Sequence, residues 1–389
     1  MKNKGLTKFL TAIGVVAVIA LVVGAILTSV VYENVLKPQD FSANGALPSG
    51  DGTGYYRHCY NELTDEEKAV YNVVVANIYD MPEKIEIPSL GSGDLNKIFT
   101  AISYDNPDLF CIGTKCSVYR EGLKSYFEPT YIMTLEEFKK QSDEASKAAN
   151  TILMGTKAYT SIYEKELYVH DYIINHCSYS DPNTNPNANS IYGCLVEGIA
   201  GCEGYARAFQ YLMNMLNIDN RLVTGESAED GVNYTGHMWN YVVLDGEGYF
   251  VDTTWDDPKG TSQVLRHTYF NVTTNDVLVK RKSINQVIPF TTATKYNYFV
   301  YESAYFTTGA GEQFSNAIDA SINNAIQRGY KCAELKFPDS ATLQQAKSTM
   351  FDQGVVYTAF KDAGLIQDLS GSKVYYSIDD KMNVICLFF

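Results

Sequence analysis

A dipeptide with strong turn chemistry, Asp245-Gly246, lies between two runs of apolar and aromatic residues. This arrangement predicts a β-hairpin with a two-residue type I′ turn. The turn fixes the register of the hairpin, because the residues on either side of it must pair. In that register His237 and Asp252 lie on one face as diagonal neighbours, about 7–8 Å apart at the backbone. A slip of one residue would place them on opposite faces.

A glycine-rich segment upstream of the hairpin leads into an amphipathic run. Gly198, Gly201 and Gly204 bracket Cys202, and glycine permits a tight backbone entry into a helix. Apolar residues then recur at helical spacing over residues 203–216. Cys202 is therefore predicted at a helix N-terminus, where the dipole and free N–H groups favour a thiolate. A free cysteine is also commonly a small buried apolar residue, so the cysteine alone leaves both interpretations open.

Together, Cys202, His237 and Asp252 form a candidate thiol nucleophile, its base and the carboxylate that orients the base. Trp239 is predicted beside the His–Asp pair, where it would shield that pair from water. The backbone N–H of Cys202 and the side chain of Tyr192 are candidates to hold an oxyanion. The competing interpretation is an ordinary hairpin with a surface histidine.

Several segments carry a resemblance to a known family. They are GCEGYARAF, GHMWNYV and YFVDTTWDDP, preceded by HDYIINHCSY and YGCLVEG. These segments, within about residues 160–260, resemble the core of the bacterial transglutaminase-like (papain-like thiol) superfamily. The resemblance implies an α+β fold in which a nucleophile helix packs on an antiparallel sheet. It also implies that Cys202 is the nucleophile, His237 the base and Asp252 the orienting carboxylate. The family includes protein cross-linkers, peptidases, peptide N-glycanases and inactive scaffolds.

The N-terminus combines a basic tip with a long apolar run. Lys2, Lys4 and Lys8 precede or open an uncharged stretch over residues 9–31. About 20 apolar residues suffice to cross a bilayer, so the run predicts a single-pass transmembrane anchor. The basic tip would then stay in the cytoplasm and the catalytic part would be extracytoplasmic. A cleaved signal peptide, which would leave a secreted protein, is the less favoured alternative because the run is longer than a usual signal core.

Changes in composition divide the chain into five segments. A stretch rich in Gly, Pro and Ser after the apolar run indicates a flexible linker. Capping boxes that begin at Thr64 and Thr134 open two helices before the core. The predicted segments are a basic tip and anchor (1–32), a linker (33–58), an N-terminal α+β region (59–155), a transglutaminase-like catalytic core (156–300) and a C-terminal α+β region (301–389).

Charge and ligand spacing limit the partners. The net charge of -14 disfavours nucleic acid, which needs a cationic surface. The expected partner is a protein or peptide substrate, with cell-envelope components suggested by the predicted location. No cofactor is expected, and no metal, because the cysteines and histidines lack zinc-ligand spacing. Asp252, Asp256 and Asp257 could bind Ca²⁺, but they lack the ligand ladder of an EF-hand.

Other cysteines and histidines admit more than one interpretation. The chain has eight cysteines, so a free Cys202 leaves an odd number that cannot all pair internally. Spacing allows bridges Cys111–Cys116 and Cys177–Cys194 without requiring either. His170 is predicted to be a hydrogen-bonded histidine, because its helix precedes the nucleophile helix and would pack beside it; a second catalytic histidine is the alternative. His267 is predicted to be structural rather than catalytic, because the base is already assigned.

The expected reaction begins with attack of the cysteine thiolate on an amide carbonyl and passes through an acyl-thioester. Water would complete a hydrolysis, whereas a primary amine would complete a cross-link. Two other interpretations stay open. One is a non-catalytic module that binds peptides or envelope components in the same cleft, and the other is a protein in which Cys202 is disulfide-bonded.

Overall fold

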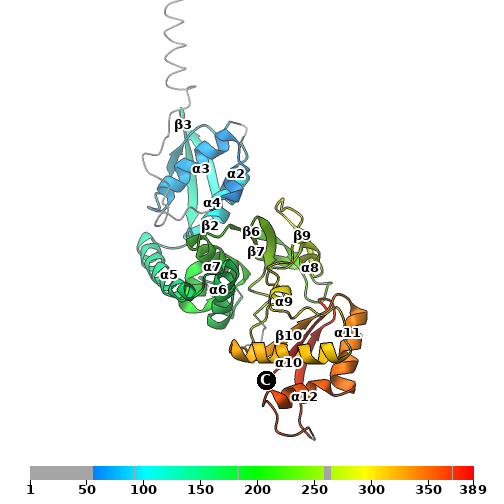
Figure 1. The fold of residues 1–389 in the computed structure, drawn as a ribbon. Helices are drawn as coiled ribbons and strands as arrows, with labels where there is room; N and C mark the ends of the chain where they lie inside the picture. Colours follow the sequence, from blue (N-terminus) through cyan, green and yellow to red (C-terminus); the bar gives the residue numbers. More distant parts are fainter. Residues whose placement is uncertain (1–55, 92, 182–183, 258–263, 370) are drawn as a thin grey trace, which may run out of the picture. The chain divides into compact units, whose positions relative to one another are not determined.

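The computed structural model describes residues 56–91, 93–181, 184–257, 264–369 and 371–389 (Figure 1). These residues form two compact units. Unit 1 comprises residues 60–102 and 112–131, and unit 2 comprises residues 56–59, 103–111 and 132–389, apart from the positions outside the description. Each unit is described by itself below.

The predicted membrane anchor requires a correction. Among the described residues, no helix is long and apolar enough to cross a membrane. The longest of them, α5 (Leu135–Gly155), has 21 residues, but charged side chains interrupt it from its first turn, and such charges are costly in hydrocarbon. This finding contradicts the prediction of a single-pass membrane protein. The predicted anchor over residues 9–31 and most of the predicted linker lie outside the described residues.

Unit 1 combines helix α3 (Asp65–Ile78) with a small antiparallel sheet. The helix begins with the predicted capping box, in which Thr64 and Glu67 each accept a hydrogen bond from the other's backbone N–H. The sheet has the order β1-β3-β2, and α3 packs against β1. The strands are β1 (Ile85–Ile87), β2 (Ile112–Glu121) and β3 (Lys124–Tyr131). Helices α2 (His58–Asn61) and α4 (Leu95–Asp105) each contain residues of both units.

The core of unit 2 places helix α7 (Cys202–Met215) against a sheet with the order β8-β7-β6-β9. Adjacent strands in it run antiparallel: β6 (Asn220–Ser227), β7 (Thr235–Leu244), β8 (Glu247–Val251) and β9 (Arg281–Ile284). Ala206 of α7 packs on Leu222 and Met238 of the sheet. Helix α5 contacts α6 (Ile162–His176), which in turn contacts α7 (Figure 1). The predicted α+β class, with this helix on an antiparallel sheet, is confirmed.

The hairpin formed by β7 and β8 has the predicted register. Asp245 and Gly246 both have positive φ, 51° and 82°, as a type I′ turn requires. Leu244 pairs with Glu247 across the turn, and the ladder continues to the last pair, Asn240 with Val251. Beyond this pair Asp252 leaves the ladder and donates its N–H to the carbonyl of Tyr269 at 3.1 Å.

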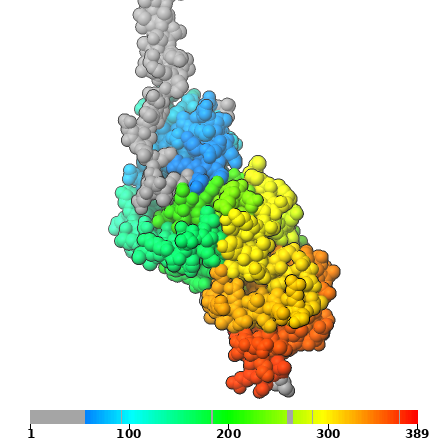
Figure 2. Space-filling view, in the orientation of Figure 1, coloured from blue at the N-terminus to red at the C-terminus, as the bar shows by residue number. Residues whose placement is uncertain are grey.

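Short elements complete the region around the core. They are η3 (Thr156–Ala158), β4 (Ser178–Tyr179), the π-helical turn η4 (Gly193–Glu197), β5 (Ile199–Ala200), α8 (Thr274–Leu278) and α9 (Tyr298–Tyr301). In Figure 2 the segment after β8, drawn in yellow, lies between the green region of α7 and the orange C-terminal region. His267 in this segment bonds to Asp171 on one side and Glu334 on the other. The segment therefore joins the core to the C-terminal region.

The C-terminal region is a three-stranded antiparallel sheet, ordered β10-β12-β11. Helix α10 packs on β10 and on α12 (Figure 1). Phe314, Ile322 and Phe337 belong to its apolar core. Its elements are α10 (Glu312–Gln327), β10 (Cys332–Lys336), α11 (Ser340–Lys347), the π-helical turn η5 (Ser348–Asp352), α12 (Val355–Asp362), β11 (Tyr375–Asp379) and β12 (Val384–Phe388).

The turn makes a stability prediction, because Gly246 has φ 82° whereas the exposed strand residue Gly236 does not have a positive φ. A Cβ at either position would meet no other atom within 4 Å. Gly246→Ala should therefore lower the unfolding free energy by about 1 kcal/mol through left-handed backbone strain alone. Gly236→Ala should cost nothing measurable. Urea denaturation of the two variants tests this, and equal effects would contradict a turn-specific origin.

Candidate active site

Cys202 is the first residue of α7 and is partly buried. The residue before it, Gly201, caps the helix without a side chain, so the amides of the first turn keep their donor capacity toward a ligand. Gly204 lets the backbone around Ala188 approach α7, since a Cβ at Gly204 would lie 2.3 Å from the carbonyl oxygen of Ala188. The sequence thus brings a thiol, free helix amides and a close-packed backbone together at one helix end.

His237 and Asp252 form the predicted hydrogen bond. Nε2 of His237 lies 2.7 Å from Oδ2 of Asp252, and both side chains are buried. The side chain of Cys202 also lies beside the imidazole and contributes to raising its pKa. Because Asp252 occupies Nε2, Nδ1 is the nitrogen that remains to face the thiol. The structure therefore brings all three residues of the predicted triad together, in the order thiol, imidazole, carboxylate.

Arg281, which sequence reasoning missed, completes this group. Nη2 of Arg281 donates to Oδ2 of Asp252, the same oxygen that faces His237. The other oxygen of Asp252 accepts the backbone N–H of Trp255 at 3.1 Å. Arg281 lies in the basic run Lys280-Arg281-Lys282, which by sequence alone resembles a solvated patch. No local signal distinguishes its buried arginine.

The charges around His237 act in opposite directions on its pKa. Burial by itself lowers the pKa, but the charge and hydrogen bond of Asp252, together with the neighbouring side chain of Cys202, outweigh burial and raise it. Arg281 opposes this increase. Burial would raise the pKa of Asp252, yet the nearby charges of His237 and Arg281 lower it. Asp252 is thus held as a carboxylate by the guanidinium of Arg281 and the imidazole of His237.

Aromatic rings enclose the pair. The indole of Trp239 stacks on His237 with a centroid distance of 5.6 Å and an interplanar angle of 21°. Trp255, which lies within the YFVDTTWDDP segment, approaches from another direction with a centroid distance of 5.8 Å. Trp239 thus lies at its predicted place, and Trp255 adds a second ring. Rings at these positions exclude water from the hydrogen bond and strengthen its electrostatics.

The two tyrosines near the nucleophile segment have different surroundings. The hydroxyl of Tyr192 forms a hydrogen bond with Glu144 of α5. Tyr179 of β4 is partly exposed, and after burial the charge of the Cys202 side chain is the largest cause of its raised pKa. Tyr179 is therefore a neighbour of the thiol in the structure. The proposed oxyanion role of Tyr192 would require its hydroxyl to leave Glu144.

His170 and His267 belong to a separate buried network, as their predicted structural role requires. Oδ1 of Asp171 lies 3.0 Å from Nδ1 of His170 and 3.1 Å from Nε2 of His267. The outer nitrogens face carboxylates as well: His170 faces Asp256 at 3.1 Å and His267 faces Glu334 at 2.9 Å. Asp256 thus binds a histidine of α6.

This network includes a set of atoms with metal-ligand spacing. Ligand atoms of His170, Asp171 and His267 lie within 4.8 Å of one another. Every ring nitrogen of the two histidines already faces a carboxylate oxygen at hydrogen-bond distance. Protons on the rings therefore account for each contact, and the geometry by itself does not require a cation.

All eight cysteines are free thiols. The bridges that spacing allowed, Cys111–Cys116 and Cys177–Cys194, are not formed. Cys202 is likewise unbridged in the structure.

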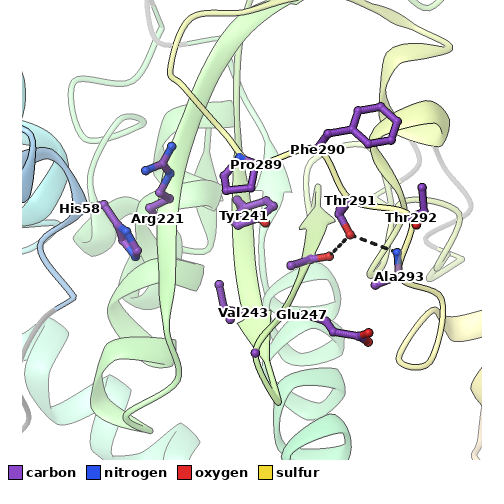
Figure 3. A pocket seen from close by; sticks show the side chains of 12 residues that line it. His58, Arg221, Tyr241, Val243, Glu247, Pro289, Phe290, Thr291, Thr292 and Ala293 are labelled. Atoms are coloured by element: carbon purple, nitrogen blue, oxygen red, sulfur yellow. Dashed lines mark hydrogen bonds between the residues drawn. The ribbon is translucent and has the colours of Figure 1, made fainter.

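A pocket of 440 Å³ lies elsewhere on the sheet of unit 2 (Figure 3). Its lining includes Arg221, Tyr241 and Phe290 but none of the three triad residues. Tyr241 is four residues beyond His237 on β7, about 13 Å along a strand. The pocket is therefore distinct from the thiol site.

The buried network predicts a dependence of stability on pH. Burial alone would lower the pKa of His267, but Asp171 and Glu334 raise it to about 10, against about 6.5 in an unfolded chain. The folded protein then binds the extra proton between these values, so this stabilisation is complete below about pH 6.5 and is lost as pH rises toward 10. Urea denaturation between pH 7 and 9 should show the decline.

His267→Gln should flatten that decline by about one proton, or about 1.4 kcal/mol per pH unit. His176→Gln is the matched control, because the His176 ring contacts the carbonyl of Leu195 instead of a carboxylate. The control should keep the slope of the wild type. An unchanged slope in His267→Gln would contradict the ion-paired network.

Residues 147–253 match the model of the transglutaminase-like superfamily. No curated protein matches the chain. The likeness to this superfamily therefore lies within unit 2.

Three solved structures show low overall similarity to this chain. "Crystal structure of a TGase" has 18% identity and a TM-score of 0.28, covering 39% of this chain and 47% of that one. A "Putative Cysteine Protease from Cytophaga hutchinsonii" has 16% identity and a TM-score of 0.25, covering 36% and 61%. A "putative protease from Parabacteroides distasonis" has 12% identity and a TM-score of 0.23, covering 36% and 30%. The match thus spans less than two thirds of each of these chains.

Proposed function

We propose that this protein is a thiol enzyme that acts on amide bonds of a protein or peptide substrate. Cys202 is the nucleophile, His237 the base and general acid, and Asp252 the residue that orients the imidazole. The observation that carries the proposal is the buried 2.7 Å hydrogen bond between His237 and Asp252, beside the thiol of Cys202 at the start of α7. A nucleophile, a base and an orienting group in this order activate a cysteine for acyl transfer.

The first half of the reaction forms a thioester. The imidazole of His237 accepts the thiol proton, and the sulfur attacks the amide carbonyl carbon to give a tetrahedral oxyanion. N–H groups in the first turn of α7 are the donors available to that oxyanion. The intermediate then breaks its C–N bond, His237 returns the proton to the leaving amine, and the acyl group stays on sulfur.

The second half transfers the acyl group to an acceptor. His237 removes a proton from water or from a primary amine as it attacks the thioester carbonyl. Collapse of the intermediate expels the cysteine sulfur, with an acid as the product from water and a new amide from an amine. The same residues serve both outcomes, so the enzyme is a hydrolase, an acyltransferase, or both, according to the acceptor that reaches the thioester.

Asp252 contributes by holding the ring rather than by reacting. Its 2.7 Å contact fixes Nε2, which leaves Nδ1 directed at the thiol. Its negative charge favours the imidazolium that forms when the thiol is deprotonated. The stacked ring of Trp239 limits rotation of the imidazole about its side-chain bonds.

Triad variants test this assignment directly. With casein as acyl donor, Cys202→Ala or His237→Ala should lower the rate by about 10⁴-fold or more, and Asp252→Asn by about 10³–10⁴-fold. Cys116→Ser is the matched control, because this thiol is only half-buried and lies outside the site; it should keep the rate of the wild type. Ammonia or peptide release and incorporation of dansylcadaverine are measured in parallel to identify the acceptor.

Alkylation separates an enzyme from a binding module without any substrate. Iodoacetamide should modify Cys202 of the wild-type protein at least about tenfold faster than in His237→Ala at pH 7, because the imidazole accepts the thiol proton. Mass spectrometry of the peptide that contains Cys202 gives the rate. Slow and equal modification in both proteins would exclude the thiol enzyme and favour a non-catalytic peptide-binding module.

A further inference from the structure

We propose that Arg281 is a positioning residue of the thiol site: its guanidinium shares the carboxylate of Asp252 with His237, which keeps the imidazole able to release its proton. The inference rests on the proposed function for its catalytic meaning. The arrangement itself consists of buried groups that can be measured without turnover. Arg281 lies outside residues 147–253, the part matched by the transglutaminase-like model.

A single oxygen of the Asp252 carboxylate is shared by His237 and Arg281. Oδ2 of Asp252 faces Nε2 of His237 at 2.7 Å and also accepts a hydrogen bond from Nη2 of Arg281. All three residues are buried. A carboxylate oxygen bound by two cationic donors divides its negative charge between them. Each donor thereby reduces the hold of Asp252 on the other.

Three aromatic rings and the carboxylate of Asp252 surround the guanidinium of Arg281. Its guanidinium carbon lies 4.5 Å from the ring centre of Trp255, 4.7 Å from that of Tyr269 and 5.2 Å from that of Trp239. These are cation–π distances. Nη1 has only a long contact of 3.4 Å to the carbonyl of Val277. Among the ion pairs of the described residues, Asp252 is the carboxylate that Arg281 binds.

Strand pairing explains how a residue so far along the chain reaches the site. Arg281 opens β9, which pairs with β6, and its Cα partner there is Ser227. On the other side of β6, Gly225 pairs with His237 of β7. Arg281 and His237 therefore approach the segment after β8 from two strands separated by β6. Only the assembled sheet brings Arg281 and His237 to Asp252.

The proposed reaction requires His237 both to accept and to release a proton. A general acid and base works best when its proton is neither too tightly nor too weakly held at the working pH. A buried carboxylate paired with imidazole alone would hold the ring proton strongly. In this site Cys202 of α7 and Asp252 after β8 face His237 and favour the protonated ring, whereas Arg281 of β9 opposes it. Arg281 thus weakens the attraction of Asp252 for the protonated imidazole. Without Arg281 this attraction would slow proton delivery to the leaving amine.

NMR titration of His237 in labelled full-length protein tests the inference. The signal is assigned by its loss in His237→Gln. Arg281→Gln keeps a donor toward Asp252 but removes the charge, and should raise the pKa of His237 by about one unit, a tenfold change in proton affinity. Arg281→Lys keeps the charge and should stay close to the wild type.

Arg328→Gln is the matched control for general loss of an ion pair. Arg328 binds the two carboxylates of Glu164 and Glu302 away from the thiol site. This variant should lose stability without shifting His237. If the shift in Arg281→Gln is absent, or if the pKa of His237 falls, the inference is overturned.

Two further measurements keep the result decisive. Should Arg281→Gln fail to fold, the pair Asp252→Asn and Asp252→Asn/Arg281→Gln is compared, because neither leaves a buried carboxylate unpaired. The double variant should again have the higher pKa at His237, and an equal value would overturn the inference. The titration does not depend on turnover, so an inert Cys202 would refute the proposed function while the role of Arg281 is still decided.

In an active enzyme the same shift has a kinetic consequence. The alkaline limb of kcat/KM, which reports loss of the imidazolium proton in the free enzyme, should move upward by about one pH unit in Arg281→Gln. It should move little in Arg281→Lys and not at all in Arg328→Gln. A merely structural role for Arg281 would lower the amount of active protein without moving this limb.

Discussion

The carboxylate of Asp252 is the point on which the rest of the site depends. One oxygen faces His237 and Arg281, and the other accepts the N–H of Trp255. A buried carboxylate is stable only when its charge and lone pairs are satisfied. Each partner comes from a different part of the sheet and its loops. The strands of the sheet therefore have to pair correctly before the imidazole can be directed at Cys202.

Local chemistry explains what could be predicted from the sequence. Turn residues, capping boxes and helix-entry glycines act within a few positions of the chain, so they specify the hairpin register and the start of α7 without knowledge of the fold. The contact between His237 and Asp252 follows from that register. The resemblance to transglutaminase-like proteins depends on the same segments. The fold of the core could therefore be predicted from the sequence better than that of its flanks.

Long-range pairing explains what could not be predicted. Arg281 reaches Asp252 because β9 joins β6, and nothing in the run around Arg281 indicates that strand partner. The hydroxyl of Tyr192 binds Glu144, a contact that depends on how the π-helical turn η4 packs against α5. The partners of His170 and His267 likewise come from segments distant in the chain. Sequence periodicity reports which residues are buried, but it does not report which buried charges meet.

The central claim is that Cys202 carries an acyl group during turnover. Intact-protein mass spectrometry after acid quenching of the full chain with excess acyl donor tests this most directly. We expect an added acyl mass that maps to Cys202, is removed by hydroxylamine as a thioester should be, and is absent in Cys202→Ser under the same treatment. Turnover of the donor with no adduct on Cys202, or with an equal adduct in Cys202→Ser, would show that Cys202 does not carry the acyl group.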